Sequence, residues 1–298
     1  MSKIDLYQTV TDQIVTAIET GASGEKWVMP WTGFANGLPY NPTTKASYRG
    51  VNVIMLWGEA TAENYPSNEW ASYKQWQGRD AQVRKGEHGT VIVYYGSASR
   101  EVENETGETE EKQFRFLRYS KVFNASQVDG WQSPKTERPD LAKRIDSAES
   151  FVANTEAVIR FGGGRAFYTH TKDYIAMPNW DQFTDTKTAT ATENAYGTLL
   201  HELTHWTGHE RRCERKFGKR FGDQAYAMEE LVAELGAAFL CAKIGITPAP
   251  RRDHAQYISH WLKTMKADKR AIFTAASKAS DAVDFLNGLQ AAKTAEAA

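Results

Sequence analysis

The segment LLHELTHW constrains this chain more than any other stretch of its 298 residues. It places His201 and His205 four residues apart, and on an α-helix two such side chains project from one face. Neutral imidazoles on one face can share a divalent metal ion, and Glu202 beside them can take a proton from water. We therefore predict a helix over residues 191–207 that carries a metal site. The expected ion is Zn²⁺, with Mn²⁺ or Co²⁺ as alternatives.

A third metal ligand is expected from the next helix. In the pattern HExxHxxGxxH the last histidine would stand at Arg211, so that class of metallopeptidase is excluded. The segment MEELVAELGAAFL instead offers three glutamates. We prefer Glu229, because it shares its helical side with small residues that permit close approach to the histidine helix. Glu230 and Glu234 form an i,i+4 pair on another side and stay open as ligands, as groups behind the ligands or as solvated side chains.

The chain divides into two halves of different character. Six of the nine tryptophans lie in the first half, which mixes helical and strand signals. The polar, proline-bearing stretch QSPKTERPD ends this pattern, so we place one domain at residues 1–135 and a second at 136–298. The expected fold class is α+β. It comprises an N-terminal α+β domain with a small antiparallel sheet and a C-terminal zincin-like, mainly helical domain with a short sheet.

Periodicity and turn residues predict the order of the elements. Apolar residues at helical spacing, with acids between them, indicate a core-facing helix at the N-terminus. A tract of six glutamates between residues 101 and 111 is typical of an exposed hairpin tip. The other expected elements are helices at 51–60 and 70–77, strands at 91–95 and 114–128, a helix opening the second half, two short strands about a turn at 172–173, and helices at 191–207, at 225–244 and beyond.

The composition argues against several classes of protein. A net charge of −1 does not suit a protein that coats nucleic acid indiscriminately, although residues 1–135 outside the acidic tract carry 14 basic and 10 acidic residues. No stretch has the roughly 18 uncharged apolar residues of a membrane-spanning helix, and the N-terminus does not resemble a secretory signal. The two cysteines, Cys213 and Cys241, suit a reducing compartment. We therefore expect a cytoplasmic protein without a membrane partner.

Aromatic and basic residues interleave along the first half. Single-stranded DNA suits such a surface, because unstacked bases lie on aromatic rings at roughly 1–3 kcal/mol each while cations meet the phosphates. The alternative is that these rings belong to the core, where tryptophans of small domains usually lie. The residues that we expect to contact DNA are Trp31, Tyr40, Lys45, Tyr48, Arg49, Trp76 and Lys85.

A resemblance to a known family runs along nearly the whole chain. It is carried by the segments PWTGF, PYNPTTKASYRGVN, VRKGEHGTVIVYY, KVFNASQV, HELTH and EELVAELGAAFL, which resemble those of the ArdC-type antirestriction proteins. The resemblance implies an N-terminal single-stranded-DNA-binding domain and a C-terminal zincin-like metallopeptidase domain. It further implies a protein of plasmids and conjugation that shields incoming DNA from host restriction. Its metal ligands would be His201, His205 and a glutamate of the EEL segment, with Glu202 as catalytic base.

Two hypotheses about function stay open at this point. In the first, the protein binds single-stranded DNA and protects incoming mobile-element DNA by occupancy, with the metal in an auxiliary role. In the second, it is a DNA-tethered metalloprotease, similar to SprT-like proteases, whose partner is a DNA-bound protein or the host restriction machinery. A structural zinc site does not need Glu202, so the complete motif favours a zinc-dependent metallopeptidase.

Overall fold

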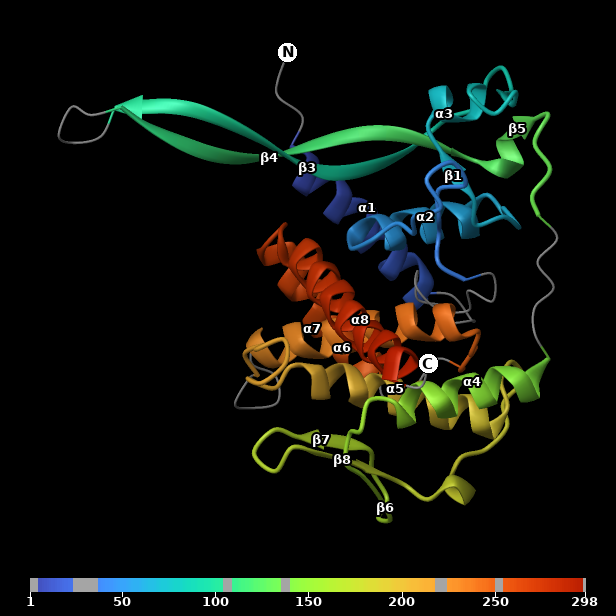
Figure 1. The fold of residues 1–298 in the computed structure, drawn as a ribbon, viewed down its shortest axis with the longest axis vertical. Coiled ribbons are helices and arrows are strands. Elements are labelled where there is room, and N and C mark those ends of the chain that lie inside the picture. Colours follow the sequence, from blue (N-terminus) through green and yellow to red (C-terminus); the bar gives the residue numbers. More distant parts are fainter. Residues whose placement is uncertain are drawn as a thin grey trace.

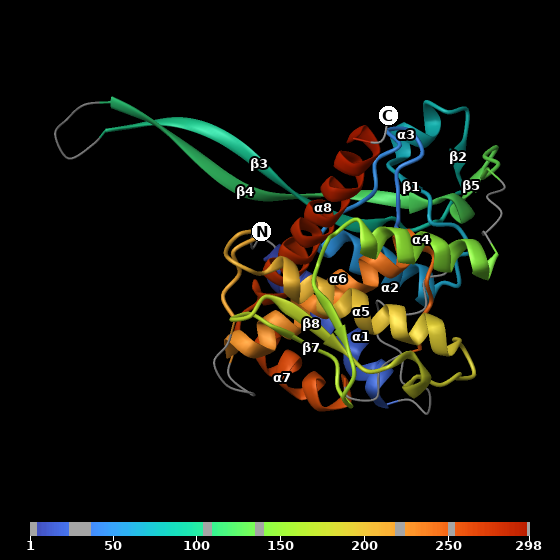
Figure 2. The ribbon, with the colours of Figure 1, turned by 60° about the horizontal axis from the view of Figure 1, so that its bottom comes forward.

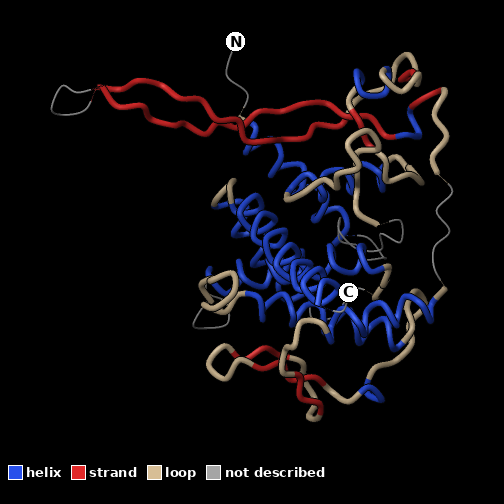
Figure 3. The backbone as a smooth tube through the Cα atoms, in the orientation of Figure 1, coloured by secondary structure: helices blue, strands red, loops and turns tan. Residues whose placement is uncertain are grey.

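The structure is a computed structural model, and it describes residues 5–23, 37–103, 109–134, 140–217, 224–249 and 254–296. Trp31, the middle of the acidic tract and residues 135–139, where we place the domain boundary, lie outside the described residues. Helices occupy the middle of the molecule, and strands lie on either side of them (Figure 3). Within the part of the chain that is described, none of the helices combines the length and apolarity needed to cross a bilayer.

The N-terminal half carries a long antiparallel ribbon. Its elements are α1 (Leu6–Ser23), α2 (Val51–Ala62), β1 (Trp70–Ala71), α3 (Tyr73–Gln77), β2 (Gln82–Val83), β3 (Thr90–Glu103), β4 (Thr109–Asn124), the 3₁₀ turn η1 (Ala125–Gln127) and β5 (Val128–Asp129). Strands β3 and β4 pair from Thr90↔Val122 to Glu103↔Thr109, and β1 pairs with the other edge of β4. The outer ribbon projects away from the helices (Figure 1). The predicted hairpin is confirmed.

The ribbon is longer than the strand that we predicted over residues 91–95. Tyr95 is 60% exposed, and residues 97–100 are all exposed, yet the backbone pairing continues through them. Apolar alternation marks a strand only where one of its faces is buried, and the outer ribbon has no such face at these positions. The apolar pattern in the sequence therefore ends earlier than the strand itself.

The helix that we predicted over residues 70–77 begins later than expected. Residues 70–71 instead form strand β1 and pair with residues 123–124. Helix α3 starts after Ser72, whose hydroxyl accepts the N–H of Gln75 while the Gln75 side chain accepts the N–H of Ser72. This reciprocal capping box satisfies two backbone donors at the helix start, so it marks the boundary between strand and helix.

The C-terminal half stacks helices on a small mixed sheet. Its elements are α4 (Leu141–Ala153), β6 (Ile159–Phe161), β7 (Phe167–Thr169), β8 (Tyr174–Met177), the 3₁₀ turn η2 (Trp180–Gln182), α5 (Ala191–Thr207), α6 (Gln224–Ile244), α7 (His254–Ala267) and α8 (Ala271–Glu296). The sheet order is β6-β8-β7, with β6 parallel and β7 antiparallel to β8. Figure 2 shows α5 running beside this sheet, with α6 next to it. The two short strands and the α+β class are confirmed, whereas β6 was not anticipated.

One apolar core joins the two halves of the sequence. Buried residues of α1 and α2, such as Val10 and Ile54, belong to the same cluster as Leu200 of α5 and Leu240 of α6. Across the junction the rings of Trp57 and Phe239 lie 5.8 Å apart. A fragment ending near residue 135 would therefore expose apolar surface that the intact chain buries.

Helices α5 and α6 approach each other closely at Gly236. A Cβ atom at this position would lie 2.4 Å from Cγ2 of Thr204, so a larger residue would force the helices apart. Thr204 is itself buried, and its hydroxyl donates to the Leu200 carbonyl at 2.9 Å. The short separation brings the glutamates of α6 within reach of the histidines of α5.

Candidate metal centre

The two histidines of the HELTH segment lie on a well-defined helix. A capping box starts α5, because the Thr190 hydroxyl accepts the N–H of Glu193 and the Glu193 carboxylate accepts the N–H of Thr190. His201 and His205 are both buried, and the centroids of their rings are 4.9 Å apart. The predicted helix is confirmed, and its two imidazoles share one face.

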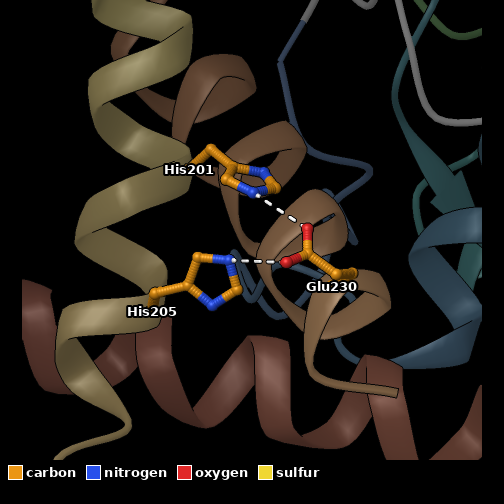
Figure 4. Close-up of side chains that lie close together, drawn as sticks. All are labelled: His201, His205 and Glu230. Atoms are coloured by element: carbon orange, nitrogen blue, oxygen red, sulfur yellow. Dashed lines mark ion pairs between the residues drawn. The ribbon is translucent and has the colours of Figure 1, made fainter. Parts of the chain in front are cut away.

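The carboxylate of Glu230 lies between the two imidazoles (Figure 4). Nε2 of His201 is 3.5 Å from Glu230 Oε2, and Nε2 of His205 is 3.6 Å from Glu230 Oε1. One ligand atom from each of these three residues lies within 4.8 Å of the others. Donor atoms about 2.0–2.2 Å from a tetrahedral ion are about 3.3–3.6 Å from one another, so this set fits a divalent metal.

Each imidazole also presents its Nδ1 atom to a further glutamate, a different one for each ring. Nδ1 of His205 is 3.2 Å from Glu229 Oε1, and Nδ1 of His201 is 3.7 Å from Glu234 Oε2. Metal-binding histidines commonly present their second ring nitrogen to a carboxylate, which orients the ring and leaves the other lone pair for the metal. The geometry therefore favours Glu230 as third ligand over the Glu229 that we preferred from the sequence. Glu229 lies behind His205.

Arg215 neutralises Glu229 in the interior. Its guanidinium donates from Nε to Glu229 Oε2 at 3.0 Å and from Nη2 to Oε1 at 2.8 Å. The same group donates to the Thr207 hydroxyl at 2.8 Å and to the Thr204 carbonyl at 2.5 Å, and the arginine side chain is only 3% exposed. Burial raises the pKa of Glu229, but the hydrogen bonds from His205 and Arg215 outweigh it and hold the pKa below its ordinary value.

Glu230 is also ionised in this arrangement. Burial raises its pKa, yet the hydrogen bond to His201, the charges of both imidazoles and a hydrogen bond from Tyr226 together lower the pKa to about 2. A carboxylate that stays charged in a buried site is the form that a divalent cation binds. Glu202, the predicted general base, is the neighbour of His201 on α5 and is 4% exposed.

Sequence reasoning missed an aromatic and ionic cluster beside the histidines. The His170 ring stacks on His209 with centroids 5.0 Å apart, and Phe217 lies 4.9 Å from His170 and 6.2 Å from His205. Arg212 forms an ion pair with Asp173 in the turn between β7 and β8 and donates to the carbonyl of residue 206 at 2.6 Å. The turn is thus tied to the end of α5. The basic stretch after HELTH was the signal in the sequence that could have indicated this cluster.

The expected DNA-binding residues fall into different environments. Trp76 has to be corrected: it is 0% exposed, and its indole N–H donates to the Phe123 carbonyl at 3.0 Å, so its ring cannot stack on a base. Lys85 is exposed in the turn between β2 and β3. The remaining four described residues, Tyr40, Lys45, Tyr48 and Arg49, line one cavity.

The fold and the site define a class of protein for the C-terminal half. A helix with an HExxH segment runs beside a short sheet and is followed by a helix that supplies carboxylates. Residues 146–278 match the family model of a zincin-like metallopeptidase. The C-terminal half is therefore a zincin-like metallopeptidase domain.

Comparison of the whole chain identifies the family. Residues 4–123 match the N-terminal domain of anti-restriction factor ArdC. The crystal structure of the metal-free antirestriction ArdC protein from the R388 plasmid is similar, with a TM-score of 0.79, 39% identity, and coverage of 97% of this chain and 98% of that one. Its Mn(II)-bound structure is also similar, with a TM-score of 0.74, 36% identity, and coverage of 97% and 99%. The chain belongs to the ArdC-type family of antirestriction proteins.

Further proteins are similar to this chain in sequence. Uncharacterized protein y4eC of Sinorhizobium fredii is 41% identical, and the match covers 96% of this chain and 92% of that protein. Two proteins named DNA primase TraC, from Escherichia coli, are 33% and 31% identical over 95% of this chain. The matches cover only 27% and 20% of the primases, so this chain corresponds to a segment of those longer proteins.

Proposed function

We propose that this protein binds single-stranded DNA and shields the incoming DNA of a mobile element from host restriction. Membership of the ArdC-type family supports the proposal, as does the gathering of two tyrosines and two cations of the first half around one cavity. The division of roles along the chain, with DNA binding in residues 1–135 and the metal centre in residues 136–298, is part of the proposal. We further propose that the protein acts in the cytoplasm, where incoming DNA meets restriction enzymes.

The second part of the proposal is a hydrolytic metal centre. His201, His205 and Glu230 would hold a divalent ion, with Zn²⁺ as the first candidate and Mn²⁺ or Co²⁺ as alternatives. When bound, such an ion lowers the pKa of water and polarises a carbonyl group. Glu202 would take a proton from water and return it to the leaving amine, a role worth typically 10²–10⁴-fold in rate. Glu229 and Glu234 would orient the two imidazoles.

A single observation carries this assignment. Both Nε2 atoms face one carboxylate, that of Glu230, while both Nδ1 atoms face other carboxylates. An accidental pair of core histidines would not need charged partners on both ring nitrogens, because burying so many carboxylates is costly. Burying these carboxylates without a compensating charge would be costly, so the arrangement supports the binding of a cation between them.

The test compares wild type with Glu202→Gln. The variant should keep its bound metal and its affinity for single-stranded DNA, since Glu202 is proposed as a base and not as a ligand. It should lose hydrolysis of a denatured generic protein such as casein in the presence of Zn²⁺ or Mn²⁺. Glu210→Gln is the matched control, because Glu210 is an exposed acid just beyond α5. Loss of the metal in Glu202→Gln, or wild-type hydrolysis by it, would contradict the assignment.

The alternative function is proteolysis of a protein on DNA, with the host restriction machinery as one candidate substrate. The burial of Glu202 beside His201 favours it, because a purely structural metal site has no use for this carboxylate. Plasmid transfer into restricting and non-restricting recipients separates the two functions. If Glu202→Gln still protects transferred DNA, occupancy explains protection; if protection disappears while DNA binding remains, proteolysis does.

A further inference from the structure

A cavity of about 490 Å³ lies where the loop over residues 37–50 meets α6 and α8. Ligand-binding cavities typically measure about 300–1,000 Å³, and this volume suits one nucleotide. The loop contributes Tyr40, Tyr48 and two cations to the wall, and the C-terminal half contributes Lys243 and Asp284. The cavity is therefore built by both halves of the chain.

The charged groups of the cavity have a positive balance. Lys45, Arg49 and Lys243 line it, against one acid, Asp284. Arg49 forms an ion pair with Asp284 and lies 3.6 Å from Asp281, so its charge is partly compensated. Among the described residues Lys243 forms no ion pair, and burial lowers its pKa although the charge of Asp284 opposes this. An anion in the cavity would stabilise the Lys243 ammonium.

Two tyrosines supply rings that are held in place. The Tyr48 hydroxyl donates to the Trp70 carbonyl at 2.9 Å, and the Tyr40 hydroxyl donates to Glu69 Oε1 at 2.7 Å. Burial raises the pKa of each phenol to about 12, so both are neutral at physiological pH. A neutral ring with an anchored hydroxyl loses little entropy when a base lies against it, and every base offers a π-face.

We propose that this cavity receives one nucleotide of single-stranded DNA, with a phosphate near Lys45, Arg49 and Lys243 and the base against Tyr40 or Tyr48. The inference rests on the proposed DNA binding and adds a C-terminal contact to it. A paired base cannot enter a cavity of this size, so the site selects unpaired strands. It also places DNA against α6, the helix that carries the glutamates of the metal centre.

The experiment measures the affinity of the full-length protein for a fluorescent oligothymidylate across a salt series. Lys243→Met should weaken binding by about tenfold and reduce the salt slope by about 0.7, the value for one lost phosphate contact on a single strand. Asp284→Asn should instead strengthen binding by about 1.5- to 5-fold, because it releases Arg49 and removes the opposing charge. A misfolded variant would not bind more tightly. Lys263→Met, on the exposed side of α7, is the matched control and should change neither quantity.

The outcomes separate this inference from the proposed function. If wild type binds the oligothymidylate and neither Lys243→Met nor Asp284→Asn changes the affinity, the cavity is not the site, although DNA binding stands. If wild type does not bind it at all, both proposals fail. Thymidine monophosphate is the second probe. Should it bind as tightly as the oligothymidylate, the cavity is a free-nucleotide site and the assignment to a DNA strand is overturned.

Discussion

Replacing Arg215 by methionine tests the interior of the metal centre most directly. The substitution keeps most of the side-chain volume but removes the partner of Glu229, three hydrogen bonds to that carboxylate, and the bonds to Thr207 and Thr204. Glu229 would then be a buried carboxylate that keeps His205 as its partner among the described residues. Removing one partner of a buried ion pair typically costs about 3–5 kcal/mol, because the other charge stays buried and uncompensated.

The cost should appear in thermal unfolding of the metal-free protein. At about 2–4 °C per kcal/mol in domains of this order of size, Arg215→Met should lower Tm by about 6–20 °C. The double variant Arg215→Met with Glu229→Gln should recover part of this loss, because it no longer buries an unpaired charge. A coupling of at least about 1.5 kcal/mol between the two positions is expected.

Metal binding gives a second measurement on the same variant. Without Arg215 the Glu229 carboxylate is less well held behind His205, and loss of such supporting groups typically weakens metal affinity by about 10–100-fold. Two results would refute the reasoning: a Tm shift below about 2 °C, or strictly additive effects of the two substitutions in the double variant. Either would mean that Arg215 and Glu229 do not depend on each other.

Three further predictions concern the metal ligands, unfolding by acid, and the aromatic residues of the first half. Glu230→Gln should abolish stoichiometric metal binding, measured by elemental analysis, whereas Glu229→Gln should weaken it by about 10–100-fold; the reverse order would exchange their roles. Because folding lowers the pKa of Glu230 from 4.5 to about 2, the stability that it contributes is present above pH 4.5 and is lost as pH falls towards 2. Acid unfolding of the metal-free protein should therefore be steeper for wild type than for Glu230→Gln. Trp76→Ala should cost about 3–5 kcal/mol in chemical denaturation and leave the DNA affinity of the folded fraction unchanged, whereas Tyr48→Leu should weaken DNA binding by roughly 1–3 kcal/mol.

Local signals in the sequence sufficed for the elements that bear the site. The four-residue spacing of His201 and His205 predicted a helix over residues 191–207, and α5 has these bounds. The acidic tract predicted that the strands on either side of it form a hairpin, and β3 pairs with β4 up to Glu103↔Thr109. In each case the information lies within a few residues, because helix periodicity, capping and turn formation are local properties of the backbone.

Only the tertiary structure decided which glutamate faces the Nε2 atoms of both histidines. Glu229 and Glu230 are neighbours on α6, about 100° apart around the helix axis, and both have the chemistry of a ligand. The packing of α6 on α5, set by the contact between Gly236 and Thr204, turned Glu230 towards the Nε2 atoms and Glu229 towards Arg215. The rotation of one helix against another depends on side chains far apart in the sequence, so periodicity within α6 could not reveal it.

The same limit applies to the proposed DNA surface. Whether an aromatic ring lies in the core or against solvent depends on what covers it, and Trp76 is covered by strands that meet it only in the folded chain. The cavity that Tyr48 and Arg49 line is also lined by Lys243, nearly two hundred positions further along the sequence. The sequence by itself determined which residue types and local elements were available. The shared core of the two halves decided which of them meet, because burial of apolar surface acts between segments irrespective of their distance along the chain.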